Sequence, residues 1–117
     1  MLLIAAVTVM GRLVLAALFI LAGVSKFIDP EPVRSHMEKE GVPGLLLYVV
    51  APFEIVAGIA LAAGWELAIA AAALSLFCIA TAFLIHLHLS DRVERTQFVK
   101  DLALAGGLAV IAARAVS

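Results

Sequence analysis

Four apolar runs, each close to the length of a membrane-spanning helix, take up most of this 117-residue chain. They cover residues 2–27, 43–63, 66–89 and 96–116. A helix needs about 20 consecutive apolar residues to cross the hydrocarbon core of a bilayer. Because a helix satisfies its own backbone hydrogen bonds in lipid, helices are the expected spanning form. Three short connections then predict one all-α domain over residues 1–117, an integral membrane four-helix bundle with up-down-up-down topology.

The composition agrees with a membrane protein and excludes most soluble classes. Hydrophobic residues make up 65% of the chain and charged residues 15%, and the mean hydropathy is +1.17. Average soluble domains are about 45–50% apolar and about 25% charged, and a small soluble fold has too much surface to bury the excess. The net charge of −1 provides no basic surface, so we expect the lipid bilayer and not nucleic acid as partner. The single cysteine, Cys78, reads as a small buried hydrophobe.

The one sizeable connection, residues 29–43, predicts a short interfacial helix between the first two spanning helices. Asp29 is a candidate N-cap, Pro30 or Pro32 suits a first turn, and Gly41 can end the helix.

The distribution of lysine and arginine predicts the orientation in the membrane. The side that carries the connections 29–43 and 90–95 holds five basic residues, namely Lys26, Arg34, Lys39, Arg92 and Arg95. The opposite side holds only Arg114, in the last turn of the fourth run. The positive-inside rule therefore predicts that both connections are cytoplasmic and that both termini lie outside.

Arg12 is the single charged side chain between residues 1 and 24, and Glu54 is the single one between residues 42 and 65. Each costs about 2.5–3.5 kcal/mol at the centre of a membrane helix on insertion scales. Such residues usually face the interior of a bundle, pair with one another and mark a functional site. At 1.5 Å per residue, Glu54 lies near the midplane, within reach of the long Arg12 side chain, so we expect the two to pair.

Helical spacing aligns the other polar residues into one stripe on each run. Four inward stripes predict a polar pocket that is wet at the loop side and closed by the Arg12–Glu54 pair. On the fourth run the stripe holds Lys100, Leu104, Gly107, Ile111 and Arg114. Asp101 is expected to pair with Lys100, Arg12 or Lys26. The candidate pocket residues are Arg12, Lys26, Glu54, His86, Lys100 and Asp101.

Two residue pairs have a spacing that invites a metal interpretation. His36 and Glu40 share a helical face at i,i+4, but a solvated polar face explains them as well. His86 and His88 point about 200° apart on a helix, so a shared ion would require the helix to end there. We therefore expect no metal site, and interpret His86 as a pocket residue able to relay protons.

Four segments carry a further signal: GRLVLAALFILAGVSKF (residues 11–27), the P-x-E-x-x-x-G of Pro52, Glu54 and Gly58, ATAFLIHLH (80–88) and QFVKDLALAGGL (97–108). In this order they resemble the DoxX family of small bacterial four-helix inner-membrane proteins. The resemblance implies a multi-pass protein of the bacterial cytoplasmic (inner) membrane. It also implies an association with redox or oxidative-stress proteins. The polar positions of the family fall on Arg12, Lys26, Glu54, His86 and Lys100, whereas Asp101 stands where the family usually has Asn.

Together, pocket and resemblance favour an accessory or anchor subunit of a redox system whose pocket binds a quinone-like or other small ligand. The chain contains no nucleophile–base pair, thiol pair, haem motif or dinucleotide motif, so autonomous catalysis is not expected. Two alternatives remain open. One is a small proton-coupled transporter that uses Glu54 and His86 as a relay. The other is a structural scaffold, for instance a homo-oligomer formed through the alanine-rich third run.

Overall fold

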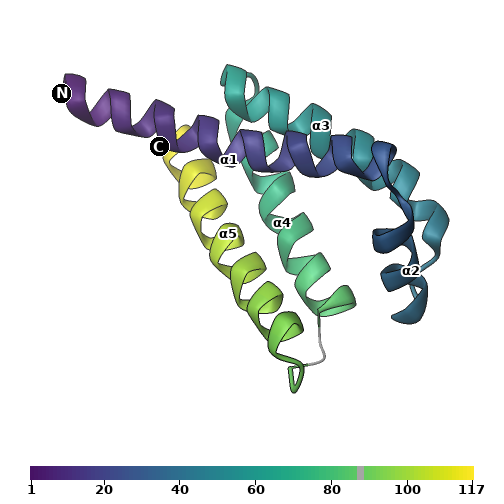
Figure 1. The fold of residues 1–117 in the computed structure, drawn as a ribbon. Helices are drawn as coiled ribbons and strands as arrows, with labels where there is room; N and C mark the ends of the chain where they lie inside the picture. Colours follow the sequence, from purple (N-terminus) through teal and green to yellow (C-terminus); the bar gives the residue numbers. More distant parts are fainter. Residues whose placement is uncertain (87–88) are drawn as a thin grey trace.

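The structure, a computed structural model, describes residues 1–86 and 89–117, and the described residues form helices and turns without strands (Figure 1). The all-α prediction is therefore confirmed. The elements are α1 (Leu2–Ile28), α2 (Glu31–Lys39), the 3₁₀ helix η1 (Gly44–Leu46), α3 (Leu47–Ala63), α4 (Leu67–Ile85) and α5 (Arg92–Val116).

Three segments of the described chain are long and apolar enough to cross a membrane: Leu2–Ile28, Gly44–Ala63 and Leu67–Ile85. The protein is therefore an integral membrane protein. α5 is also long, with 25 residues. Its first ten residues, however, include five charged side chains, namely Arg92, Glu94, Arg95, Lys100 and Asp101. The apolar part of α5 is consequently short for a complete span.

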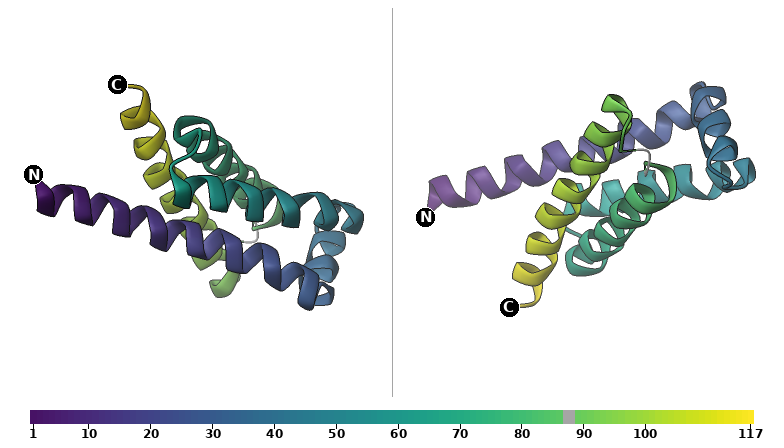
Figure 2. Two further views of the ribbon diagram at one scale, coloured as in Figure 1. Left: turned by 90° about the horizontal axis from the view of Figure 1, so that it is seen from above. Right: turned by 90° about the horizontal axis from the view of Figure 1, so that it is seen from below.

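The four long helices pack as two antiparallel pairs, α1 with α3 and α4 with α5 (Figures 1 and 2). The pairs are joined by the turn between α3 and α4, and they diverge with distance from that turn. Gly64 ends α3 in the left-handed conformation, with φ of +74°, which glycine adopts without steric cost. The arrangement is thus more open than four nearly parallel helices.

Two glycines allow α1 and α3 to approach closely. A Cβ atom on Gly23 would lie 2.6 Å from Ile55 Cγ1 and 2.8 Å from the backbone oxygen of Ala51. A Cβ on Gly58 would lie 2.8 Å from Ile20 Cγ1. Small residues at such positions bring helix backbones together in membranes. This contact sets which α1 side chains face α3.

The α4–α5 pair packs around buried apolar side chains, whereas the α1–α3 pair is brought together by glycines. Leu74 and Leu108 are fully buried, and Cys78 is 2% exposed, so the prediction of a buried thiol is confirmed. Ser75 Oγ donates a hydrogen bond to the backbone oxygen of Ala105 across the pair, at 2.8 Å. This satisfies a hydroxyl that would otherwise be costly to bury.

The short helix in the first connection is present, but its cap differs from the prediction. The N-cap of α2 is Pro30. Asp29 instead ends α1, where its backbone N–H donates to the backbone oxygen of Ser25. The reason is that α1 continues to Ile28, which leaves Asp29 no room to cap α2. Gly41 follows α2 with φ of +81°, as expected of a residue that ends a helix.

The boundaries around the last connection also differ from the prediction. α4 ends at Ile85 and not at residue 89, with His86 as its C-cap. α5 begins at Arg92 and not at residue 96, because the Asp91 carboxylate accepts hydrogen bonds from the backbone N–H groups of Val93 and Glu94. Aspartate is a favoured N-cap. The predicted loop 90–95 is therefore largely the first turn of α5.

Candidate ligand cavity and polar cluster

A cavity of about 710 Å³ lies between the two helix pairs. Side chains from all five α-helices line it, and apolar residues such as Leu18, Phe19, Val50, Phe77 and Leu84 form much of its wall. Its polar lining residues are Lys26, His36, Glu54, Thr81, His86, Glu94, Gln97, Lys100 and Asp101. Five of the six residues predicted from the sequence thus border one cavity, and Arg12 does not.

Glu54 pairs with Lys26 inside this cavity. Lys26 Nζ lies 2.5 Å from Glu54 Oε1, and the two side chains are 15% and 4% exposed. Lys26 Nζ also lies 3.4 Å from the backbone oxygen of Ala22. Gly23, one turn before Lys26, lets α1 sit against α3 beside Glu54, since a Cβ there would lie 3.3 Å from Glu54 Cβ. The close helix contact therefore places the ammonium group next to the carboxylate.

The prediction that Arg12 pairs with Glu54 is wrong. The Arg12 guanidinium lies beside Gly64, where a Cβ would be 3.4 Å from Nη2. Gly64 is ten residues beyond Glu54, about 15 Å along the helix axis. Because α1 and α3 are antiparallel, Arg12 faces the end of α3 and Lys26 faces its middle. At the C-terminus of α3, the Arg12 guanidinium is stabilised by the negative end of the helix dipole.

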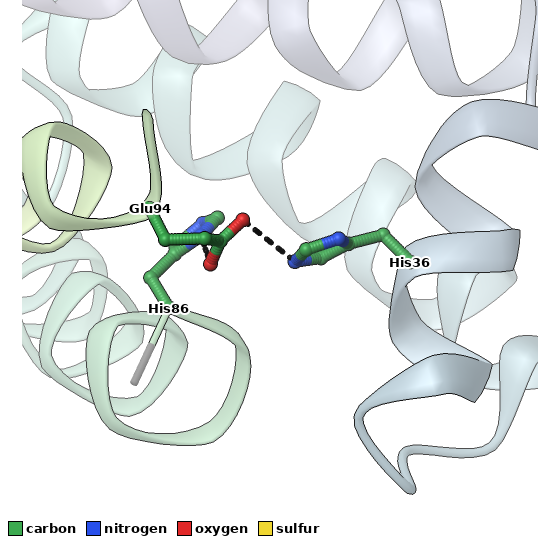
Figure 3. A group of neighbouring side chains, drawn as sticks. All are labelled: His36, His86 and Glu94. Atoms are coloured by element: carbon green, nitrogen blue, oxygen red, sulfur yellow. Dashed lines mark hydrogen bonds and ion pairs between the residues drawn. The ribbon is translucent and has the colours of Figure 1, made fainter. Parts of the chain in front are cut away.

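A second polar cluster joins α2, the end of α4 and the first turn of α5 (Figure 3). Glu94 Oε1 lies 3.3 Å from His36 Nε2, and Glu94 Oε2 lies 3.1 Å from His86 Nδ1. The two imidazole rings are stacked, with centroids 5.6 Å apart. His36 Nε2 is also 3.2 Å from the backbone oxygen of Ile85. Glu94 thus lies between two histidines that are 50 residues apart in the sequence.

Asp101 faces this second cluster and not the cations expected for it. Its Oδ2 lies 3.8 Å from His86 Nε2, which is an ion-pair distance. The expected pairing with Lys100, Arg12 or Lys26 is therefore replaced by a contact with His86. The cause is the C-terminus of α4, which releases His86 from the helix and directs its ring towards α5.

The polar stripe predicted for the last helix is also displaced. α5 buries Ala105 and Leu108, whereas Lys100, Gly107 and Arg114 are exposed. Leu104 and Ile111 of the predicted stripe are half-buried against the core, so the inward face is rotated from that stripe by at most one position, about 100°. Lys100 still borders the cavity, but from its exposed rim.

Sequence reasoning missed Glu94 and the meeting of His36 with His86. The two pairs considered as metal ligands, and not favoured, were local: His36 with Glu40 and His86 with His88, and His88 lies outside the described residues. A cluster formed across three elements leaves no spacing signal. The only local hint was the D-x-x-E pattern from Asp91 to Glu94, a helix-start signature that places Glu94 in a first turn.

The sequence matches a known protein family and a known protein. The sequence profile of the DoxX family matches residues 7–87, from α1 to the end of α4. The chain is 32% identical over 102 residues to the inner membrane protein YqjF of Escherichia coli (strain K12). That alignment covers 87% of this chain and 78% of the relative. No solved structure matches the chain.

Proposed function

This chain belongs to the DoxX family, and from that premise we propose a membrane-embedded accessory or anchor subunit of a redox or oxidative-stress system. Its cavity binds a quinone-like small ligand. The relative that it matches is named an inner membrane protein, which supports a location in the bacterial inner membrane. The family resemblance supports the redox context, and the cavity supports the ligand.

The observation that carries the ligand proposal is a cavity with apolar walls and charged groups at one part of its lining. Its volume of about 710 Å³ is within the usual range of about 300–1,000 Å³ for small-molecule sites. A quinone has an apolar tail and two carbonyl oxygens that accept hydrogen bonds. Lys26, Gln97 and Lys100 supply N–H groups to such a head group, and Leu18, Phe77 and neighbouring side chains suit the tail.

Organic extraction and mass spectrometry of the purified protein test this proposal. Protein extracted with its surrounding lipid is compared with the Glu54→Gln variant and with Glu66→Gln as the matched control. Glu66 is exposed at the α3–α4 turn and does not line the cavity. We expect a stoichiometric quinone-like molecule in the wild type and the control, and its loss in Glu54→Gln. An empty wild-type protein would contradict ligand binding.

The redox context has a separate test. A strain that lacks the protein is expected to show altered oxidant sensitivity or respiration. If both are unchanged, the redox assignment is lost even where a ligand is found.

The proton-coupled transporter is the second candidate, because the titratable residues Lys26, Glu54, His86 and Asp101 all line one cavity. It requires pH-dependent flux in proteoliposomes that disappears in Glu54→Gln. Absence of flux together with a bound quinone would leave the accessory subunit as the supported function.

A further inference from the structure

We propose that His36, His86 and Glu94 form a binding site for a divalent transition-metal ion at the polar part of the cavity. This inference goes beyond the ligand-binding function above, because it requires neither a quinone nor a redox partner.

The separations of the three ligand atoms match those around a single ion. Zinc binds imidazole nitrogen at about 2.0–2.1 Å and carboxylate oxygen at about 2.0–2.2 Å, so neighbouring ligands of one tetrahedral ion lie about 3.4 Å apart. The distances from the Glu94 oxygens to His36 Nε2 and His86 Nδ1 are 3.3 Å and 3.1 Å. One ligand atom from each residue lies within 4.8 Å of the others. An ion therefore fits with small side-chain movements.

The chemistry of the ligands selects the class of ion. Two imidazoles with one carboxylate suit zinc and its neighbours in the first transition series, whereas calcium and magnesium prefer oxygen ligands alone. Three protein ligands leave at least one position of a tetrahedral ion open. All three residues line the cavity, so an ion held by them would border the space in which a small molecule would bind.

Asp101 provides the outer-shell contact that such a site needs. Histidines that bind metals usually present their second ring nitrogen to a carboxylate or carbonyl, which sets the tautomer. His86 presents Nδ1 to Glu94 and Nε2 to Asp101 Oδ2, at 3.8 Å. Asp101 Oδ2 is buried and has no hydrogen-bond partner in the described part of the chain. A slight closure on metal binding would give this oxygen a partner.

An ion at this position would also link α2 to the α4–α5 pair, with which it otherwise has few contacts among the described residues. His36 lies on α2, His86 ends α4, and Glu94 is in the first turn of α5. A ligand that binds only the folded state stabilises it in proportion to its occupancy. We therefore expect metal binding to raise the thermal stability of the protein.

Titration of the full-length protein with zinc tests the site. The protein carries no polyhistidine tag, is purified in detergent, is treated with a chelator, and is titrated with Zn²⁺ against a chromophoric competitor. We expect one equivalent to bind. Removal of a ligand in His36→Ala, His86→Ala or Glu94→Gln should weaken binding by more than the about 10–100-fold that outer-shell substitutions cost. The loss of zinc affinity in Asp101→Asn should be about 10–100-fold.

The matched control is Glu31→Gln, an exposed glutamate at the start of the helix that carries His36. It should bind zinc as the wild type does. Co²⁺ added to the wild type gives a second measurement, independent of whether the variants fold, because tetrahedral nitrogen and oxygen ligation produces strong visible bands. The same ion should raise the unfolding temperature.

Two results would overturn the proposal. One is a wild-type protein that neither binds zinc nor shows the cobalt bands, in which case Glu94 only forms ion pairs with the histidines. The other is binding that all three ligand variants retain, which would place the ion elsewhere. Neither result bears on the quinone extraction, so the two proposals fail independently.

Discussion

At the scale of single residues, the costly carboxylate of Glu54 is neutralised by a lysine in the last turn of α1. Lys26 is 15% exposed and Glu54 4% exposed, so both charges are largely removed from water. Loss of one partner from a buried ion pair leaves the other uncompensated, which typically costs about 3–5 kcal/mol. Replacement of both by neutral groups is often close to neutral.

We therefore expect Glu54→Gln and Lys26→Met each to lower the thermal stability of the purified protein, by an amount equivalent to about 3 kcal/mol. The double variant should recover much of that loss, because no unpaired charge remains. Thermal unfolding of the four proteins in one detergent measures this coupling. Purely additive losses would show that the pair does not interact, and Arg12→Gln combined with Glu54→Gln should give no recovery.

At the scale of elements, Gly23 allows the close contact between α1 and α3. The Asp91 N-cap sets where α5 begins. Gly23 faces backbone and side-chain atoms of α3 closer than a Cβ atom tolerates. Gly106 on α5 has nothing within 4 Å of the corresponding position. The two glycines are equal in helix propensity and differ only in what surrounds them.

Gly23→Ala should separate α1 from α3 and destabilise the protein by about 1–3 kcal/mol, the usual range for overpacking. Gly106→Ala should be neutral or stabilising by up to about 1 kcal/mol, since alanine is the better helix former. Thermal unfolding of both variants provides the comparison. Equal effects at the two positions would contradict the close contact. The Gly23 variant should also weaken the Lys26–Glu54 pair.

At the scale of the whole molecule, the connection between α1 and α3 lies at the same side of the cavity as the start of α5. The His36–Glu94 contact joins the connection after α1 to the start of α5. Up-down topology requires this arrangement, and we propose that this side is cytoplasmic, as the distribution of basic residues predicts.

Cysteine accessibility tests the orientation. Because Cys78 is the only cysteine, Cys78→Ala provides a background for single cysteines at Ser35, Ser90 or Ser117, which are exposed. An impermeant maleimide applied to cells with a permeabilised outer membrane should label only the Ser117 position. The other two should react only after lysis. The reverse pattern would invert the topology.

Some properties of this protein follow from its sequence alone. Run lengths and hydropathy determine the helices and the membrane environment, since burial of an apolar helix in lipid depends on local composition. The same reasoning identifies Glu54 as a buried charge, because its neighbours along the run are uniformly apolar. The partners of Glu54 and of His36, by contrast, depend on how the helices pair.

Only the tertiary structure decides which groups meet. Glu54 contacts Lys26 and not Arg12 because α1 and α3 cross closely at Gly23, which sets their relative height. His36 reaches Glu94 because α4 ends before His86 and α5 is capped by Asp91. Helical periodicity describes faces within one element, whereas rotation and crossing of separate helices result from side-chain packing between them, which no local pattern records.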